Sequence, residues 1–427
     1  MDGNSHMNRC RRALVLAAIG MAMASVMGTA RAADHLDTPS VIADPAADIG
    51  DLFAWMAPDG RRLNLVMAIV AHRFSDRLLY VLHVDSGTRF GATTATTTIA
   101  CRFGVDGAVE CWAGEADHAR GAASEPAGLA GRNGRFRIFA GLRDDPFFNN
   151  VKGSRAALDV AAAALRAGTD RDPAGCPRFG SETSRQILDR WQRTGDGPGT
   201  NFLAGWTPAS LVISVDLDIV APGGPLLAVW GAVHELAGDT DGSSAPAVAS
   251  GSEPSRARIP APPIPGAQIE RMGRALTANA LLGLFADAGV SNRLKEEYNR
   301  AGQADWPRFT DEIERGLALY DGFDGRCGNQ WLAAPAAEPR APYRRLARLL
   351  ADDRLWIDAA AIVCNRYLGI ELAADADADC GGRTPNHDAV DVFRSLLVMG
   401  AREGVADGVD RDERVHSIGE FPFLASP

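Results

Sequence analysis

The chain has 427 residues, and 46% of them are hydrophobic, which is an ordinary content for a globular protein. It carries 54 acidic and 44 basic residues, and the net charge of −10 repels nucleic acid and anionic membrane surfaces but attracts cations. The length is sufficient for one large domain or two.

Residues 1–32 have the organisation of a secretory signal peptide. A basic stretch at 8–12 precedes an uncharged apolar run at 13–28, and Ala30-Arg31-Ala32 provides a cleavage site. Cleavage after Ala32 would remove four arginines and one aspartate and so change the net charge from −10 to −13. A membrane anchor needs about 20 apolar residues. Because no second run of that kind follows, we expect a periplasmic or secreted protein with no membrane anchor after cleavage.

Strands are predicted through most of the first half of the chain. Short apolar or threonine-rich runs are separated there by Gly, Asp and Pro, as is typical of strands. These runs occupy residues 63–70, 78–85, 92–100, 136–139, 210–220 and 226–233. An alanine-rich helix at 154–168, with Ser154 as its cap, interrupts them. Several strands of this kind indicate antiparallel sheets packed face to face.

Helices are predicted to dominate the second half. Apolar positions recur at helical spacing in residues 267–288, 308–320 and 341–351. A helix at 384–400 has Thr384 as its cap, Pro385 in the first turn and Gly400 as its stop. Its buried stripe would be Val390, Phe393 and Leu397.

Residues 243–266 are rich in Pro, Ser and Ala and are typical of a linker or a long surface loop. They separate a strand-rich part at 33–242 from a helix-rich part at 267–427. The predicted fold is therefore α+β, with an antiparallel β-sandwich-like core, helical insertions and a helix-rich C-terminal part. We expect residues 33–427 to form a single domain.

Six cysteines follow residue 32, and an even number in an exported chain favours disulfides. Cys101 and Cys111 flank the turn-rich FGVDG, which suits a bridged hairpin. Cys364 and Cys380 form a second local pair, which leaves Cys176 with Cys327. Six cysteines allow 15 pairings, so other arrangements stay open.

Several motifs of common enzyme classes are missing from the sequence. It contains no G-x-S-x-G, no C-x-x-C, no P-loop and no G-x-G-x-x-G. His234-Glu235 begins like H-E-x-x-H, but Gly238 stands where the second histidine should be.

The stretch at 35–55 combines a histidine with four aspartates and contains no lysine or arginine. His83 and Asp85 alternate on a predicted strand, so both side chains leave the same face. If that face meets the N-terminal segment, His35, Asp37 and Asp48 could converge with them on a transition metal. The alternative is a buried polar network in which carboxylates orient histidines.

Carboxylates recur in four loop-like segments further along. These are Asp144-Asp145, Asp239 with Asp241, Asp375 with Asp377 and Asp379, and Asp407 with Asp410 and Asp412. Dense carboxylate oxygens suit a hard cation such as Ca²⁺, although aspartates also serve in turns and helix caps. The candidate metal ligands are His35, Asp37, Asp44, Asp48, Asp51, His83, Asp85, Asp144 and Asp145.

Two arginines stand three residues apart in a predicted helix. Arg271 and Arg274 would share one helix face and could clamp an anion. Pairing with Asp144, Asp145 or Asp391 is the alternative that we prefer in so acidic a chain.

Taken together, the motifs resemble the bacterial domain-of-unknown-function 4331 family. They run in order along nearly the whole chain: DHLDTP at 34–39, RDDPFF at 143–148, NF and AG at 201–205, RMGR at 271–274, GR at 382–383 with Asp388 and Asp391, DGVD at 407–410 and FPFL at 421–424. The resemblance implies an exported bacterial protein of mixed, strand-rich architecture. It implies no activity, and it places Asp388 and Asp391 among the residues of interest.

We therefore expect an exported binding or structural protein rather than an enzyme, possessing a divalent cation and an unidentified small-molecule or protein partner. One alternative is a periplasmic metal-assisted hydrolase with Asp144 or Asp145 as base. Another is an interaction protein that docks through residues 243–266. Carboxylates bonded to backbone amides or arginines would favour the non-enzyme.

Overall fold

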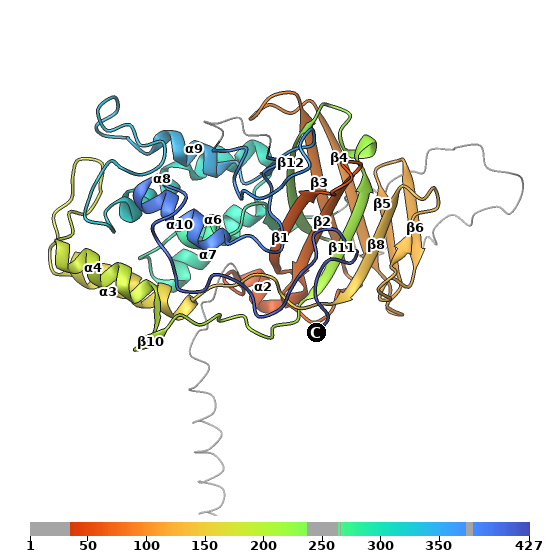
Figure 1. Ribbon diagram of the computed structural model, residues 1–427, viewed down its shortest axis with the longest axis horizontal. Helices are drawn as coiled ribbons and strands as arrows, with labels where there is room; N and C mark the ends of the chain where they lie inside the picture. The colour runs from red at the N-terminus through yellow and green to blue at the C-terminus, as the bar shows by residue number, and fades with distance from the viewer. Residues whose placement is uncertain (1–34, 237–263, 265, 373–378) are drawn as a thin grey trace, which may run out of the picture. The chain divides into compact units, whose positions relative to one another are not determined.

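The structure, a computed structural model, describes residues 35–236, 264, 266–372 and 379–427. Two antiparallel sheets form its centre (Figure 1). The first has five strands, in the order β1 (Ile49–Met56), β2 (Arg62–Ile69), β11 (Ala209–Asp216), β8 (Phe136–Leu142) and β7 (Leu129–Ala130). The second has the order β13 (Gln268–Met272), β12 (Leu226–Glu235), β3 (Leu78–Gly87), β4 (Ala95–Phe103), β5 (Val109–Ala113) and β6 (Asp117–Gly121), and β14 (Leu355–Asp358) also pairs with β12. A separate ribbon joins β9 (Arg193–Thr194) to β10 (Gly197–Pro198).

The two sheets pack face to face at Gly231. A Cβ atom added to this glycine of β12 would lie 2.6 Å from the Cε atom of Met67 on β2. Every residue of β1 and β3 is buried, so both faces of these strands are covered. The sequence of a strand covered on both faces is a continuous apolar run, and β2 and β3 were predicted from such runs.

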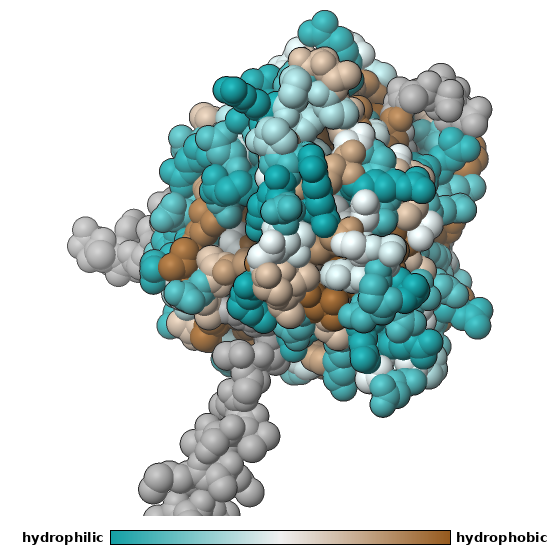
Figure 2. All heavy atoms as spheres, turned by 90° about the vertical axis from the view of Figure 1, so that its left-hand side faces the viewer, coloured by the Kyte–Doolittle hydropathy of each residue, from teal (hydrophilic) through white to brown (hydrophobic). Residues whose placement is uncertain are grey.

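The helices gather mainly on one side of the sheets (Figure 1). Those of the first half are α2 (Pro39–Ala43), η1 (Pro45–Ala47), α3 (Val151–Arg166), α4 (Ser181–Trp191) and α5 (Leu217–Val220). Those of the second half are α6 (Thr277–Leu281), α7 (Ala288–Arg300), η2 (Gln303–Phe309), α8 (Thr310–Asp321), α9 (Arg344–Ala351) and α10 (Ala389–Met399). Figure 2 shows this side covered mostly by hydrophilic side chains, with hydrophobic ones in small groups between them.

The prediction of an α+β fold with an antiparallel, sandwich-like core is confirmed, as are the expected strands in outline. Val390, Phe393 and Leu397 are buried, and Gly400 ends α10 in the left-handed conformation, with φ 71°. Asp34–Pro427 form one compact unit. In the described part of the chain, no helix combines the length and apolar character needed to cross a membrane. The predicted signal peptide and nearly all of the 243–266 segment lie outside the described residues.

All three disulfides predicted from spacing are present. They join Cys101 to Cys111, Cys176 to Cys327 and Cys364 to Cys380. Cys101 lies directly opposite Cys111 in the β4–β5 hairpin, as the turn-rich stretch between them suggested.

The predicted helix at 267–288 is wrong over its first half. Residues 268–272 form β13, which pairs with β12, and only Thr277–Leu281 are helical. At Gly273 a Cβ atom would lie 1.7 Å from the carbonyl oxygen of Asp353, so the chain crosses another segment there. The available edge of β12 and this close crossing outweigh the helical spacing of the apolar residues.

Two predicted helix caps are also displaced. The helix α3 begins at Val151, and Asn150, rather than Ser154, accepts the Gly153 N–H. The helix α10 begins at Ala389, with Asp388 as its cap in place of Thr384. Both caps are short polar side chains of the preferred kind, but several such residues compete in each segment.

Candidate functional site

Three aspartates near the start of the chain each contact a cation from the helix-rich part. Asp37 accepts a hydrogen bond from Lys295 at 2.8 Å, and both side chains are at most 9% exposed. Asp85 accepts one from Arg354 at 3.1 Å. Asp51 pairs with Arg383, and both are 1% exposed. These buried pairs tie the sheets to the helix-rich part.

The surroundings of the histidines and of the N-terminal aspartates overlap in part, because Asp85 acts on the charge of His83, and Asp48 and Asp37 both act on that of Glu270. The His83 ring stacks on Trp230 with centroids 3.9 Å apart, and burial lowers the pKa of His83 to about 4. Asp44 caps η1, and Asp48 accepts a hydrogen bond from the Leu36 N–H at 2.6 Å. The Cε1 atom of His35 lies beside Gly50 of β1.

The structure does not gather His35, Asp37, Asp48, His83 and Asp85 around one ion. In the described part of the chain, three groupings hold three donor atoms within 4.8 Å of one another, and none contains any of these five. Asp37 and Asp85 do lie in buried polar contacts, but their partners are Lys295 and Arg354 and not the histidines of the predicted network.

Asp51 and Asp145 share a single buried arginine. The Arg383 guanidinium contacts Asp51 and lies over the rings of Phe53 and Phe147, 4.1 and 5.1 Å from their centroids. Burial raises the pKa of Asp145 well above its usual range, and the nearby Asp51 carboxylate raises it further. Burial therefore favours the neutral form of Asp145, and the ion pair that the structure contains at this place is the one between Asp51 and Arg383.

The two arginines of the RMGR motif are not paired as predicted. Arg271 contacts Asp353 at 3.3 Å, and Arg274 contacts Glu371 at 3.2 Å. The preferred pairing with Asp144, Asp145 or Asp391 is wrong, because β13 and the following turn bring these arginines beside the segments that contain Asp353 and Glu371. Both guanidinium groups are buried. Arg274 donates to Glu371 and to the carbonyl oxygens of Leu349 and Asp352. Arg271 donates to Asp353 and to the carbonyl oxygen of Tyr298, while its Nη2 atom has no hydrogen-bond partner among the described residues.

Asp144 belongs to a compact group of donors with Asp412 and His416. The Nε2 atom of His416 lies 3.1 Å from Asp412 Oδ2 and 3.6 Å from Asp144 Oδ2. Burial, followed by the Asp412 carboxylate, raises the pKa of Asp144 to about 7. Burial opposes ionisation of Asp412 as well. Hydrogen bonds to the Asp412 carboxylate, of which the one with His416 has the largest effect, nevertheless lower the pKa of Asp412 to about 2.

The hydrogen bonds of His416 argue against a metal ion in this group. The Nδ1 atom accepts a hydrogen bond from the Ala425 N–H at 3.1 Å. A neutral imidazole with an accepting Nδ1 carries its proton on Nε2, the atom that faces the two carboxylates. Histidine ligands of metals instead donate their other ring N–H to a neighbour. We interpret the group as a proton-sharing contact that fixes the C-terminal segment against Asp144.

A second group consists only of carboxylates, from Asp388, Asp391 and Asp410. Asp388 caps α10, and Asp391 accepts a hydrogen bond from the N–H of Asp407 at 2.8 Å. Burial raises the pKa of Asp388 to about 6, and burial together with Asp388 raises that of Asp391 to about 8. Arg394 contacts Asp407 at 3.2 Å and provides counter-charge nearby. The third grouping includes Cys176 and Cys327, whose sulfur atoms form a disulfide and cannot bind a metal.

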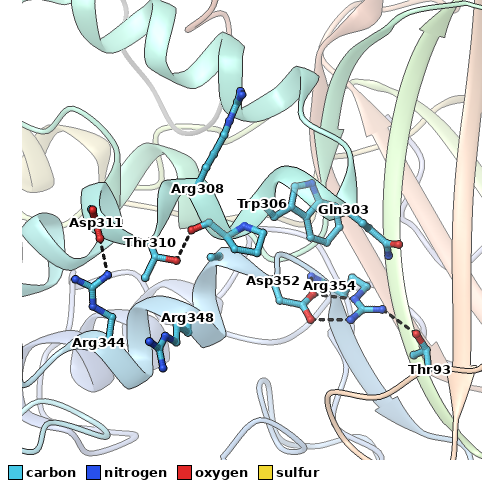
Figure 3. A pocket seen from close by; sticks show the side chains of 12 residues that line it. Thr93, Gln303, Trp306, Arg308, Thr310, Asp311, Arg344, Arg348, Asp352 and Arg354 are labelled. Atoms are coloured by element: carbon cyan, nitrogen blue, oxygen red, sulfur yellow. Dashed lines mark hydrogen bonds and ion pairs between the residues drawn. The ribbon is translucent and has the colours of Figure 1, made fainter.

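An open cleft of about 750 Å³ lies between η2, α9 and the β3–β4 connection (Figure 3). Four arginines and two aspartates line it, so its wall is basic although the protein is acidic. Figure 3 shows Arg344 and Arg348 on one side and Asp352, Arg354 and Thr93 on the other. The volume lies within the range of about 300–1,000 Å³ that is usual for small-molecule pockets.

The lining arginines differ in how much of each guanidinium is available. Arg344 contacts Asp311 and Glu314, while Arg354 is held by Asp352 and Asp85. Arg308 extends away from the cleft and donates to the carbonyl of Glu297 (Figure 3). Arg348 is exposed, and among the described residues no hydrogen bond or ion pair holds its guanidinium.

Sequence reasoning missed this cleft entirely. Arg344 and Arg348 of α9 are four residues apart in RRLAR, so they share a helix face, and this spacing was the available signal. No sequence pattern indicated that Thr93, Asp352 and Arg354 would form the opposite wall.

Comparisons with protein-family models, with curated proteins and with solved structures found no match to this chain.

Proposed function

We propose that this chain is an exported binding protein that holds a small anion in the cleft beside Arg348. The observation that supports this proposal is an exposed guanidinium at a basic cleft on an otherwise acidic protein. Among the described residues no hydrogen bond or ion pair holds it, and the Glu314 carboxylate acts on its charge only from a distance. The planar fork of arginine matches the geometry of carboxylate and phosphate oxygens.

Export is part of the proposal. The three disulfides support it, because disulfides persist in oxidising compartments. The predicted signal peptide and the resemblance to the domain-of-unknown-function 4331 family agree with it, and both stay predictions. The family contributes no activity to the argument.

Anion binding is tested by thermal melting of the purified protein with acetate, inorganic phosphate or glucuronate at constant ionic strength. A ligand that binds the native state raises the melting temperature. We expect at least one anion to do so for the wild type and for Arg345→Gln, but not for Arg348→Gln. Arg345 is an exposed neighbour on α9 outside the cleft, so it is a matched control. Equal anion effects on both variants would exclude binding at Arg348.

A divalent cation is the second candidate, and the oxygen-only group at Asp388, Asp391 and Asp410 favours it. Such a group suits Ca²⁺ better than a transition metal. Calcium should raise the melting temperature of protein treated with EDTA, and Asp391→Asn should abolish the rise. Asp76→Asn, at an exposed aspartate elsewhere, should retain it. A calcium response that survives Asp391→Asn would exclude this group.

The other two alternatives receive less support from the geometry. Asp144 and Asp145 are 1% and 4% exposed, which gives a substrate little access to either as a catalytic base. Asp37, Asp51 and Asp85 pair with cationic side chains, as expected for a non-enzyme, whereas Asp144 lies beside Asp412 and His416 as well as Arg414. Docking through residues 243–266 concerns a segment outside the described residues.

A further inference from the structure

The two ends of the cleft differ in charge. At the α9 end, the exposed guanidinium of Arg348 has no hydrogen bond or ion pair among the described residues, and the Glu314 carboxylate acts on its charge only from a distance. At the opposite end, the single guanidinium of Arg354 is shared by Asp85, at 3.1 Å, and Asp352, at 2.7 Å. Because the carboxylates of Asp85 and Asp352 neutralise the charge of Arg354, this end of the cleft has no positive charge left for a second anionic group. A ligand that spans the cleft therefore carries its negative charge at one end only.

The end beside Arg354 offers neutral hydrogen-bonding groups. The Thr93 hydroxyl oxygen accepts from Arg354 Nη1 at 3.2 Å, so its own O–H is available to donate into the cleft. The Gln303 amide donates to Asp85 at 2.6 Å, which leaves its carbonyl oxygen as an acceptor. Donors and acceptors mixed in this way match hydroxyl groups, since a hydroxyl both donates and accepts.

Apolar residues also line the cleft. Trp306 and Ala351 are only 3% and 1% exposed, so the exposed Pro307 supplies the carbon surface that an apolar face of a ligand, such as the C–H face of a sugar ring, would contact. The volume of about 750 Å³ also leaves room for more than an isolated oxyanion.

We propose that the cleft binds a hydroxylated monocarboxylate of the sugar-acid class, with its carboxylate on Arg348 and its hydroxyl groups toward Thr93 and Gln303. This inference rests on the proposed anion-binding function and specifies its ligand. The bidentate fit of guanidinium to carboxylate fixes one end, and the neutral hydrogen bonds select the other.

The test is isothermal titration of the full mature chain with glucuronate, acetate and glucose. Acetate supplies the charge without hydroxyl groups, and glucose supplies hydroxyl groups without the charge. We expect glucuronate to bind at least about 10-fold more tightly than either, because a charged contact and neutral hydrogen bonds add to each other.

Two variants locate the two ends. Arg348→Gln should weaken glucuronate binding about 10-fold, and Thr93→Val should weaken it about 5-fold while leaving acetate unchanged. The matched controls are Arg345→Gln on α9 and Thr88→Val, at an exposed threonine outside the cleft, and both should bind like the wild type. Melting curves of all four variants report folding.

The outcomes separate this inference from the function on which it rests. If acetate binds as tightly as glucuronate and both depend on Arg348, the cleft takes anions and the sugar-acid inference is wrong. If Thr93→Val leaves glucuronate binding intact, the assignment of the hydroxyl end is wrong. If no anion binds in a manner that depends on Arg348, the proposed function and this inference both fail.

Discussion

Replacing Arg383 with methionine should destabilise the protein strongly, because Arg383 provides the positive charge beside two buried carboxyl groups. Asp51 and Asp145 are 1% and 4% exposed. Removing one partner of a buried ion pair leaves an uncompensated charge and costs about 3–5 kcal/mol. The compact unit, Asp34–Pro427, has roughly 390 residues, and an unfolding entropy of about 2.1 cal/mol/K per residue gives about 0.8 kcal/mol/K. The expected fall in melting temperature is therefore about 4–6 °C.

Replacing Asp145 with asparagine should have a much smaller effect on stability than Arg383→Met. Burial raises the pKa of Asp145 well above its usual range and so favours its neutral form, which Asp145→Asn resembles in charge and size. The side-chain oxygen that accepts the Phe147 N–H at 3.2 Å is also retained by asparagine. We expect Asp145→Asn to change the melting temperature by less than about 1 °C, because nearly isosteric changes that preserve hydrogen bonds have small effects.

Calorimetry and urea denaturation at pH 7 measure both effects. An Asp145→Asn variant as unstable as Arg383→Met would show that Asp145 is the ionised partner of Arg383 and would refute this reasoning.

The disulfides should differ in their contribution to stability. The Cys176–Cys327 bridge closes a loop with a sequence separation of 151, whereas that of Cys101–Cys111 is 10. From loop-closure entropy, the first bridge should contribute about 5 kcal/mol to the free energy of unfolding and the second about 3 kcal/mol. Urea midpoints of the two double Cys→Ser variants check this order, and equal losses would contradict it. A further prediction concerns the pKa of Asp144, which burial and Asp412 raise to about 7 from 3.8. Above pH 4 the native state retains a proton that the unfolded chain releases, so this group makes stability fall as the pH rises toward 7. Asp144→Asn should flatten the fall of melting temperature between pH 4.5 and 7.5, whereas Asp76→Asn should leave it unchanged, and parallel curves for all three proteins would disprove the assignment.

The sequence by itself determined the features that depend on local patterns. Runs of apolar and β-branched residues predicted six of the strands, since a strand buried on both faces needs continuous hydrophobicity. These are β2, β3, β4, β8, β11 and β12, whereas β1, β5, β6, β7, β13 and β14 were not predicted. The hairpin cysteines and the Gly400 stop of α10 also depend on neighbouring residues alone. Spacing left three cysteine pairs, and the structure contains all three.

Only the tertiary structure decided which charges meet. Asp51 and Arg383 are 332 residues apart in sequence, and periodicity contains no information about such a contact. Residues 268–272 have helical spacing but form a strand, because the edge of β12 offers backbone hydrogen bonds that no local pattern reveals. The proton position on His416 depends in the same way on Ala425, which folding brings to its Nδ1 atom. The cleft also depends on tertiary structure. Arg348 on α9 and Thr93 in the β3–β4 connection line one cleft only because the helix-rich part packs against the sheet.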